Sequence, residues 1–596
     1  MSSQKIYEGN IEKINEKIDE VNSSINRIAL IRGIIFILFG ISVYYIIKQK
    51  GFAFILASLL LILVFVFIAY IHTKEKEKLK EFNLLIDINN EHIKRAKGEW
   101  KEFNDKGEEY LSSEHPFIND LDIFGDNSLF QWINTTKTFY GREKLAEILS
   151  STETGTAEEI SKRQKSLKEL AAKIDFRQRL EFIPLLRKSP IEKTKNFISW
   201  VKEENSWFLS SQANLIRFIM PIISIVILGS VIIFKKPVSL FLLALIVNGA
   251  ILTLKKKEIG RALEEIYSFK TNLSSYYKMI AAIENEDFKE EINLNVVGIL
   301  KGNVMASNEM KEITSIGDML FDRGNMIYWI FNSLLMWDFV LMAKLERWKL
   351  KNKNSVELWL DALGEVEALS ALSNIYFDNE NWSIPEIIEE DEIVAEDLAH
   401  PLIVPQGIKN SFNLTKPIQT ALITGSNMSG KSTFLRTIGI NMVFSYLGLP
   451  VNGRKLKLGV MIPYTCMRTK DNLEEGISSF YAEILRVKNI IRATESEKKV
   501  FYLLDEIFKG TNSVDRHTGA EMLIKQLMGK GAKGLVSTHD LELCELEQED
   551  RRIKNLHFRE YYVDNEIRFD YKLREGKSTT RNAEYLMKMA GIRLDN

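Results

Sequence analysis

TALITGSNMSGKSTFLRTIGINMVF, residues 420–444, joins a short apolar run to a helical pattern through the loop Gly425–Ser432. The loop is a complete G-x-x-x-x-G-K-[ST] element, and its flanking apolar run and helix are the context in which such loops bind phosphate. Glycines let backbone amides approach phosphate oxygens, and the N-terminus of the following helix adds its dipole. Lys431 is expected to neutralise the β- and γ-phosphates and Ser432 to bind Mg²⁺. The sequence therefore predicts a site for a nucleoside triphosphate.

Two adjacent acids, Asp505 and Glu506, end the apolar run at 500–504. Because successive side chains of a strand point to opposite faces, the two acids are expected to have different roles. Asp505 is suited to hold Mg²⁺ through water, and Glu506, just beyond the strand, to orient or deprotonate the attacking water. Together with the loop upstream, they predict hydrolysis of the triphosphate.

His539 lies in the sequence STHD that ends a third apolar run, at 534–537. A lone histidine is more often structural, but a neutral imidazole at a strand end beside the loop can hydrogen-bond the γ-phosphate or the attacking water. The short apolar runs at 421–424, 500–504 and 534–537 alternate with helical stretches. This alternation indicates an α/β layer with a largely parallel sheet.

Four stretches carry a resemblance to a known family, in that family's order. They are TGSNMSGKSTFLRTIG at 424–439, NLEEGISSFYAEI at 472–484, LLDEIFKGTNSVD at 503–515 and STHD at 537–540. Together they resemble the ATPase domain of the MutS family of DNA mismatch repair proteins. The resemblance implies an α/β ABC-type (P-loop) ATPase domain.

Weaker similarity extends beyond the ATPase. Residues 123–170 look like the start of the MutS core helical region, and residues 362–375 and 399–403 look like the helix and strand that lead back into the ATPase. Similarity then covers about 118–186 and 356–592. It implies an all-α core domain in front of the ATPase domain.

The resemblance also implies that the bound cofactors are ATP and Mg²⁺. Glu506 matches the catalytic carboxylate, Asp505 and Ser432 the residues at the metal, and His539 the residue that senses the γ-phosphate. The loop residues expected to contact the nucleotide are Gly425, Ser426, Asn427, Met428, Ser429, Gly430, Lys431, Ser432 and Thr433.

Ser478, in GISSF, matches the family's signature serine, which reaches the nucleotide of the opposing subunit. The resemblance therefore implies a composite site, so that hydrolysis requires a homodimer with facing ATPase domains. Residues 579–592 are similar to the terminal helical segment that helps to hold such domains together.

The chain departs from the MutS pattern in two respects that bear on function. No segment ahead of residue 118 resembles the mismatch-reading domain, and an apolar hairpin falls where the DNA clamp would lie. In the family an aromatic residue that stacks on adenine precedes an Ile/Val-x-Asn element, but here Gly407 precedes Ile408 and Asn410. These departures count against mismatch recognition, and we expect adenine selectivity to be weaker or to depend on Ile408.

Four long apolar runs form two pairs, each joined by a short link that contains two lysines. Crossing the apolar layer of a membrane, about 30 Å thick, takes about 20 helical residues, with about 17 as the lower limit. The second run meets this length, the third and fourth are marginal, and the first needs its flanks. Buried helices of a soluble bundle are the alternative. The runs are 33–47, 51–71, 218–234 and 237–254.

Basic residues give the expected orientation of these runs. Lysines 74, 76, 78 and 80 follow the second run, and Arg27 and Arg32 flank the first. Positive flanks favour the cytoplasm, so we expect a multi-pass membrane protein with four transmembrane helices and its ATPase domain in the cytoplasm. About 30 polar residues precede the first run, which argues against a cleavable signal peptide.

The expected organisation is therefore an all-α core that carries two transmembrane hairpins, followed by the ATPase domain. The predicted segments are an N-terminal amphipathic helix 1–32, hairpin 33–72, helical linker 73–117, first core part 118–217, hairpin 218–254, returning core part 255–390 and ATPase domain 391–596.

Two apolar patterns lie outside the transmembrane runs. A seam with spacings of three and four precedes the first run, and it is compatible equally with a dimeric coiled coil and with packing inside the chain. An aromatic pattern on the returning helices is expected to be core. The seam is Ile11, Ile14, Ile18, Val21, Ile25 and Ile28, and the aromatic pattern is Trp329, Phe331, Leu335 and Trp337.

Composition excludes several classes of protein. The 79 Lys+Arg and 80 Asp+Glu give a net charge of −1, so no overall basic excess points to nucleic acid. Two cysteines, Cys466 and Cys544, exclude a disulfide scaffold and a cysteine-rich zinc site, and favour a reducing compartment.

The function that fits these patterns is a membrane-anchored, dimeric MutS-like ATPase whose cycle is coupled to DNA, as a candidate partner, near the membrane. One alternative is an ABC-type half-transporter, but the runs contain no evident polar pathway and GISSF is not the transporter signature. The other is a nucleotide-switched membrane scaffold, against which the intact Glu506 weighs.

Overall fold

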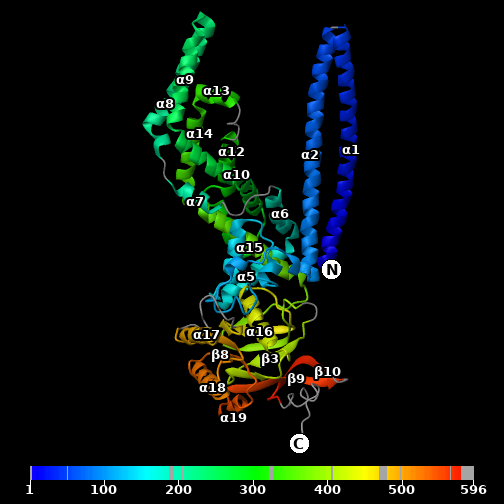
Figure 1. The fold of residues 1–596 in the computed structure, drawn as a ribbon, viewed down its shortest axis with the longest axis vertical. Helices are drawn as coiled ribbons and strands as arrows, with labels where there is room; N and C mark the ends of the chain where they lie inside the picture. Colours follow the sequence, from blue (N-terminus) through cyan, green and yellow to red (C-terminus); the bar gives the residue numbers. More distant parts are fainter. Residues whose placement is uncertain are drawn as a thin grey trace.

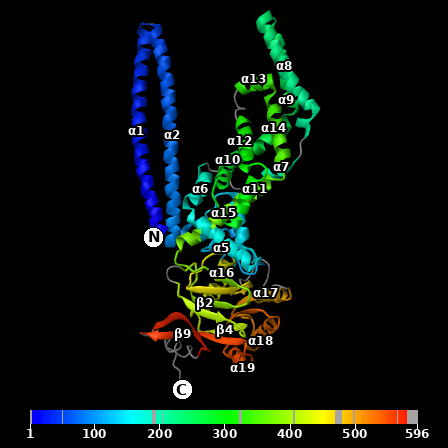
Figure 2. The same ribbon diagram turned by 180° about the vertical axis from the view of Figure 1, so that it is seen from behind.

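The protein is elongated, with an α/β part at one end, a helical core in the middle, and two helical arms that project from the core in the same direction (Figures 1 and 2). The computed structural model describes residues 3–49, 51–186, 194–203, 206–320, 326–403, 407–468, 479–496, 499–563 and 566–578.

The helices of the core and arms are α1 Ser3–Gln49, α2 Phe52–Lys97, α3 Leu129–Ile133, α4 Phe139–Leu149, α5 Ala157–Ala172, α6 Ile174–Leu185, α7 Thr194–Lys202, α8 Ser211–Phe234, α9 Val238–Leu254, α10 Lys256–Glu284, α11 Glu291–Lys301, α12 Ala306–Leu320, α13 Met326–Leu335, α14 Trp337–Asn352 and α15 Val356–Asp378. The α/β part contains α16 Lys431–Tyr446, α17 Ser479–Thr494, α18 Ser513–Gly529 and α19 Leu546–Glu549, with β1 Glu386–Ile388, β2 Ile393–Leu398, β3 Asn410–Leu414, β4 Thr420–Thr424, β5 Lys455–Gly459, β6 Ile462–Cys466, β7 Val500–Asp505, β8 Lys533–Ser537, β9 Ile553–Val563 and β10 Glu566–Glu575.

A six-stranded sheet of order β10-β9-β4-β8-β7-β6 forms the centre of the α/β part. All neighbouring strands in it are parallel except β10, which pairs antiparallel to β9. Strand β4 is buried along its whole length. Ala421 and Ile423 face the core that contains α16, whereas Leu422 faces the core that contains α18. Both faces are covered, as in other parallel sheets, and the predicted α/β layer is confirmed.

The smaller, mixed sheet has the order β1-β5-β2-β3. Its strand β2 ends at Leu398, and residues 399–403 form a turn. The expected strand at 399–403 therefore lies just upstream, at 393–398.

The helical core is built around α15, which is buried along most of its length. It contacts α4, α5 and α11. The stretch 123–170 that resembles the MutS core contains α4 and most of α5, which pack on α15. Thr138 is the N-cap of α4, and its hydroxyl accepts a hydrogen bond from Gly141 N at 3.0 Å. Residues 362–375 lie within α15, as expected.

The first arm is an antiparallel pair, α1 and α2 (Figure 1). The predicted N-terminal helix and the first apolar run are parts of the continuous α1, and α2 runs from the second apolar run to Lys97. Val21 is buried and the other seam residues of α1 are half-buried, because the seam packs on α2 of the same chain. Packing inside the chain therefore accounts for this pattern.

The second arm consists of α8 and α9. Among the residues that the structure describes, α1, α2 and α8 are long and apolar enough to cross a membrane, and α9 with the start of α10 forms a pair bent by 63° that passes the same test. Only 6–11% of the most apolar window of α1, α2 and α8 is buried. Within this chain, these three helices are therefore little covered by other helices.

Candidate functional site

The predicted loop connects β4 to α16, at the edge where the carboxyl ends of the parallel strands meet. Two of its glycines are required by geometry. Gly430 has φ +104, and Gly425 has φ +148 and leaves only 3.0 Å between an added Cβ and the Phe558 carbonyl oxygen. Residues with side chains rarely adopt such backbone angles, so the loop depends on glycine at both positions.

Lys431, the first residue of α16, folds its side chain back into the loop. Its Nζ donates to the carbonyl oxygens of Gly425 and Ser426, each at 3.0 Å. The side chain is 4% exposed, and this burial lowers the pKa of Lys431 although Glu506 opposes the effect. The ammonium group is therefore held at the centre of the loop.

Glu506 and His539 lie together beside Lys431. His539 Nε2 lies 2.7 Å from Glu506 Oε1 and 2.7 Å from Asn427 Oδ1, and Lys431 Nζ lies 3.4 Å from Glu506 Oε1. The hydrogen bond from His539, then that from Lys509, holds the pKa of Glu506 far below its usual range. Glu506 is therefore an ionised carboxylate, and the three sequence motifs meet at one point.

Asp505 points to a different neighbour, as expected from its place in the strand. Its carboxylate accepts a hydrogen bond from the hydroxyl of Ser537, which is its register partner in β8. Glu506 lies beyond the strand, with φ +50. The two acids are thus separated, Asp505 on the sheet edge and Glu506 against His539.

A cavity of about 540 Å³ adjoins the loop. Its lining residues include Leu398, His400, Ile403, Gly407, Ile408, Asn410, Phe558 and Tyr571, together with Glu506 and loop residues 427–433. The volume is typical of a small-molecule or cofactor site. The predicted loop, Gly407 and Ile408 therefore share one cavity.

Phe558 and Tyr571 of this cavity have no counterpart in the motif analysis, and His400 belongs to the stretch 399–403, for which the sequence predicts no role at the site. Tyr571, in β10, lies against the loop, since a Cβ on Gly430 would be 3.1 Å from its ring. Asn410 donates to the Tyr571 carbonyl oxygen at 3.0 Å and so joins β3 to β10. Since the aromatic residue comes from the far end of the domain, no local spacing in the sequence could have indicated it.

Two predicted elements fall outside the described residues. They are Ser478 and the terminal segment 579–592. Within the described part, Met428 and Thr433 are exposed and Ser432 is half-buried.

Comparison with known proteins agrees with this geometry. Residues 421–593 match the sequence profile of MutS domain V. The DNA mismatch repair protein MutS of Aquifex pyrophilus is 33% identical over 236 residues, which cover 39% of this chain and 27% of that protein. The same-named protein of Persephonella marina is 32% identical over 237 residues (39% and 27%), and that of Clostridium tetani is 29% identical over 257 residues (40% and 29%).

The C-terminal part of this chain is a MutS-family domain. The match with domain V includes the loop, Asp505, Glu506 and His539. The chain spans about a quarter of the length of the curated relatives it matches. The similarity predicted at 118–186 lies outside the matched domain and stays a prediction.

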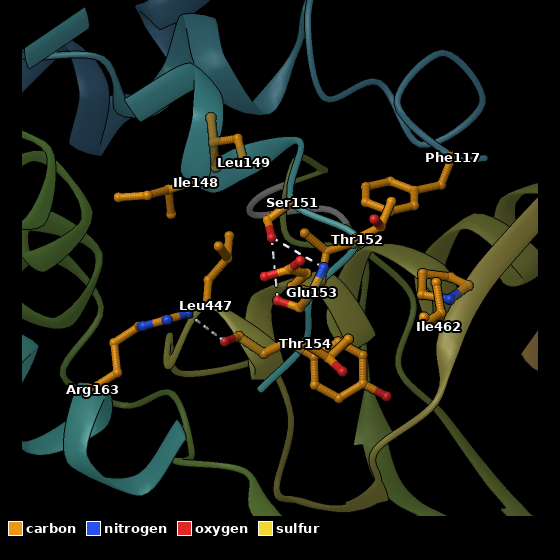
Figure 3. A pocket seen from close by; sticks show the side chains of 13 residues that line it. Phe117, Ile148, Leu149, Ser151, Thr152, Glu153, Thr154, Arg163, Leu447 and Ile462 are labelled. Carbon is orange, nitrogen blue, oxygen red and sulfur yellow. Dashed lines mark hydrogen bonds between the residues drawn. The ribbon is translucent and has the colours of Figure 1, made fainter. Parts of the chain in front are cut away.

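The MutS-family domain contacts the helical core near a second, small cavity of about 20 Å³ (Figure 3). Here Arg163 of α5 donates to the Tyr446 carbonyl oxygen at 3.1 Å. Tyr446 is the last residue of α16, whose first residue is Lys431. A single helix therefore connects the loop with the helical core.

A group of three side chains that could hold a metal includes Asp540, the residue after His539. It consists of His517, Asp540 and Glu542. His517 Nδ1 and Asp540 Oδ2 already pair at 2.7 Å. None of the three belongs to the predicted metal residues of the MutS-family domain, which are Ser432 and Asp505.

The two cysteines, Cys466 and Cys544, are both buried and unbonded, as expected.

Proposed function

We propose that this protein is a membrane-anchored ATPase that binds ATP with Mg²⁺ and hydrolyses it in a dimer. The observation that carries the proposal is the meeting of Lys431, Glu506 and His539, with Glu506 Oε1 3.4 Å from the lysine and 2.7 Å from the histidine. A buried cation, an ionised carboxylate and an imidazole at the mouth of a glycine-containing loop are the groups that phosphoryl transfer to water uses.

The residues present fit a bound triphosphate. The hydroxyl of Ser429 is buried without a hydrogen-bond partner in the described structure, and a phosphate oxygen at the loop would satisfy it. Ser432 and Asp505 would hold Mg²⁺, which neutralises charge on the β- and γ-phosphates when bound.

Each residue then has a distinct task. Lys431 binds the phosphates. Glu506, kept ionised by His539, accepts the proton of the attacking water or orients that water, and His539 fixes the carboxylate and contacts the γ-phosphate. Tyr571 and Ile408 line the cavity where the base would lie. They would therefore contact the base in place of the aromatic residue that the family has at the position of Gly407.

The proposal includes a second subunit. Met428, at the tip of the loop, is 85% exposed, so the site is open to solvent on one side. A facing subunit that supplies its Ser478 would close this side and complete the shell around the developing charge.

Membrane anchoring is supported by the apolar surface of the two arms, and DNA remains the proposed ligand of the dimer because the relatives are named for DNA mismatch repair. No observation on the described residues of the arms favours transport. The basic residues that follow the apolar runs on the side of the helical core, at 74–80 in α2 and 255–257 after α9, favour a cytoplasmic ATPase domain.

The test uses purified full-length protein reconstituted in lipid. We expect Lys431→Ala to lose ATP binding, and Glu506→Gln to bind ATP within about threefold of wild type but to hydrolyse it at least about 100-fold more slowly. The control, Glu549→Gln, changes an exposed carboxylate of α19 and should match wild type. Turnover per subunit should rise with protein density in the membrane.

The proposal is wrong if wild type binds no ATP, or if Glu506→Gln hydrolyses ATP at the wild-type rate. Full turnover by isolated single subunits would show that hydrolysis does not require a dimer.

A further inference from the structure

In helix α13, the burial of polar and apolar side chains is the reverse of that in a helix of a water-soluble protein. Its polar residues Asn332 and Ser333 are buried, 6% and 1% exposed, whereas Trp329, Ile330 and Phe331 are 64%, 50% and 42% exposed. A helix in water shows the reverse pattern. The prediction that the aromatic residues here are core is therefore wrong for Trp329 and Phe331.

The side chains of Tyr328 and Asn332 and the Ser333 carbonyl oxygen of α13 are satisfied inside the protein, whereas the buried Ser333 hydroxyl has no partner among the described residues. Asn332 Nδ2 donates to Asp338 Oδ2 at 2.9 Å, and Tyr328 donates to Asp338 Oδ1 at 2.6 Å. Asn248 of α9 donates to the Ser333 carbonyl oxygen at 2.6 Å and to Ser224 of α8 at 2.9 Å. Such internal pairing is required where no water is present, as inside a bilayer.

Helix α13 lies across the second arm and contacts both α8 and α9 (Figures 1 and 2). A Cβ on Gly249 would lie 3.7 Å from the Trp329 ring. Asn248, its polar anchor, stands ten residues after the start of α9 and six before its end, which is about 15 Å from the outer end and about 9 Å from the inner end at about 1.5 Å per residue. An arm that enters the bilayer to this depth carries α13 with it.

The exposed apolar surface of α13 continues that of the arm. On α8, Ile222, Ile223, Ile225 and Val226 are all exposed, whereas Ser224 is buried. At about 100° per residue these four side chains cover one broad apolar face, about 160° wide, such as lipid would cover. No charged residue occurs between 326 and 337, while Lys255, Lys256 and Lys257 follow α9 directly, at the level where anionic headgroups would lie.

We propose that α13 is an additional membrane element: a short helix embedded in the leaflet nearest the helical core, with Trp329, Ile330 and Phe331 against the lipid. This inference rests on the proposed membrane anchoring. The arm is then a three-helix membrane unit rather than a plain hairpin. The buried contact of Asn248 fixes α13 to the arm, and Asp338 fixes it to α14.

The test places one fluorescent label at a time on full-length protein in phosphatidylcholine bilayers. Phe331→Cys and, as a second site, Ile330→Cys are labelled with an NBD dye, and the native Cys466 and Cys544 are buried and should not react. Ile225→Cys of α8 is the reference for lipid, and Leu358→Cys of α15, 57% exposed on the helical core, is the reference for water. Quenching is measured with doxyl-labelled lipid and with aqueous iodide.

We expect the labels at 331, 330 and 225 to be quenched by doxyl lipid at least about threefold more than the label at 358, which iodide should quench. Quenching of 331 and 330 by iodide, with 225 in lipid, overturns the inference and leaves membrane anchoring intact. Shielding of 331 and 330 from both quenchers means a protein partner and also overturns it. Quenching of 225 by iodide refutes the membrane anchoring itself.

Discussion

At the scale of single residues, the candidate site contains groups whose ionisation differs from that in water. Glu506 is kept ionised by His539. His400, in the wall of the same cavity, is 7% exposed, and its burial, with the nearby Arg436, lowers its pKa to about 4. His400 is therefore neutral in the folded protein at pH 5, where an unfolded histidine, with a pKa near about 6.5, is charged.

This difference predicts a pH-dependent stability. Because the unfolded chain binds the proton more tightly, the contribution of His400 is complete above about pH 6.5 and falls between about pH 6.5 and pH 4, by up to about 3 kcal/mol. His400→Asn keeps an acceptor for Leu402 N, which lies 3.3 Å from His400 Nδ1. Thermal unfolding of the α/β part should lose less stability between pH 7.5 and pH 5 in the variant than in wild type. Equal losses would assign the acid sensitivity to other groups.

At the scale of elements, two glycines let α4 and α15 approach closely. A Cβ on Gly364 of α15 would lie 2.7 Å from the Tyr140 carbonyl oxygen, and a Cβ on Gly141 of α4 would lie 2.3 Å from Glu367 Oε2. Glu367 itself accepts hydrogen bonds from Thr138 N, at 3.0 Å, and from the Thr138 hydroxyl at the start of α4. Burial raises the pKa of Glu367 despite these donors. Thr138 and Gly141, three residues apart, thus both serve a helix crossing.

Gly141→Ala should therefore disrupt this crossing. Overpacking of this kind typically costs about 1–3 kcal/mol of folding stability. The matched control is Gly298→Ala in α11, where nothing lies within 4 Å of the added Cβ and the loss of glycine from a helix interior should be neutral or stabilising by up to about 1 kcal/mol. Urea or thermal unfolding checks the pair, and similar midpoints for both variants would contradict the proposed close contact.

At the scale of the whole molecule, the first arm meets the body through a small buried polar joint at its base. His92 of α2 lies 3.0 Å from Glu181 of α6, both almost fully buried, and the hydroxyl of Tyr7 of α1 donates to Asp378 at the end of α15 at 3.1 Å. Burial opposes ionisation of Glu181, but His92, together with Lys137 and Arg95, outweighs it, and the pKa of Glu181 is lowered. The joint ties both helices of the arm to the helical core.

Glu181→Ala should loosen this joint, since it leaves the His92 ring buried without its acceptor. Removing one partner of a buried pair costs about 3–5 kcal/mol. We expect a lower unfolding midpoint and faster tryptic release of the fragment that contains α1 and α2. Glu147→Ala, which removes an exposed partner of Lys144, is the control and should behave like wild type. Unchanged proteolysis of Glu181→Ala would show that other contacts hold the arm.

Much of this protein follows from local sequence. The glycines of the loop, the acids at the end of β7, His539 after β8 and the apolar runs are each defined by a few neighbouring residues, because backbone angles, strand alternation and helix length act over short distances. The parallel sheet then brings the three strand ends together, so the sequence determined the loop and its two chemical partners.

The tertiary structure alone decided which distant residues join them. Tyr571, His400 and Phe558 reach the cavity from separate segments, and no pattern in the sequence around them predicts that they lie there. The seam of α1 packs on α2 of the same chain. Trp329 and Phe331 face outward, although their spacing in the sequence is typical of core residues. Which side of an apolar pattern becomes interior depends on what packs against it, and that is a sum of long-range contacts that no short stretch of sequence contains.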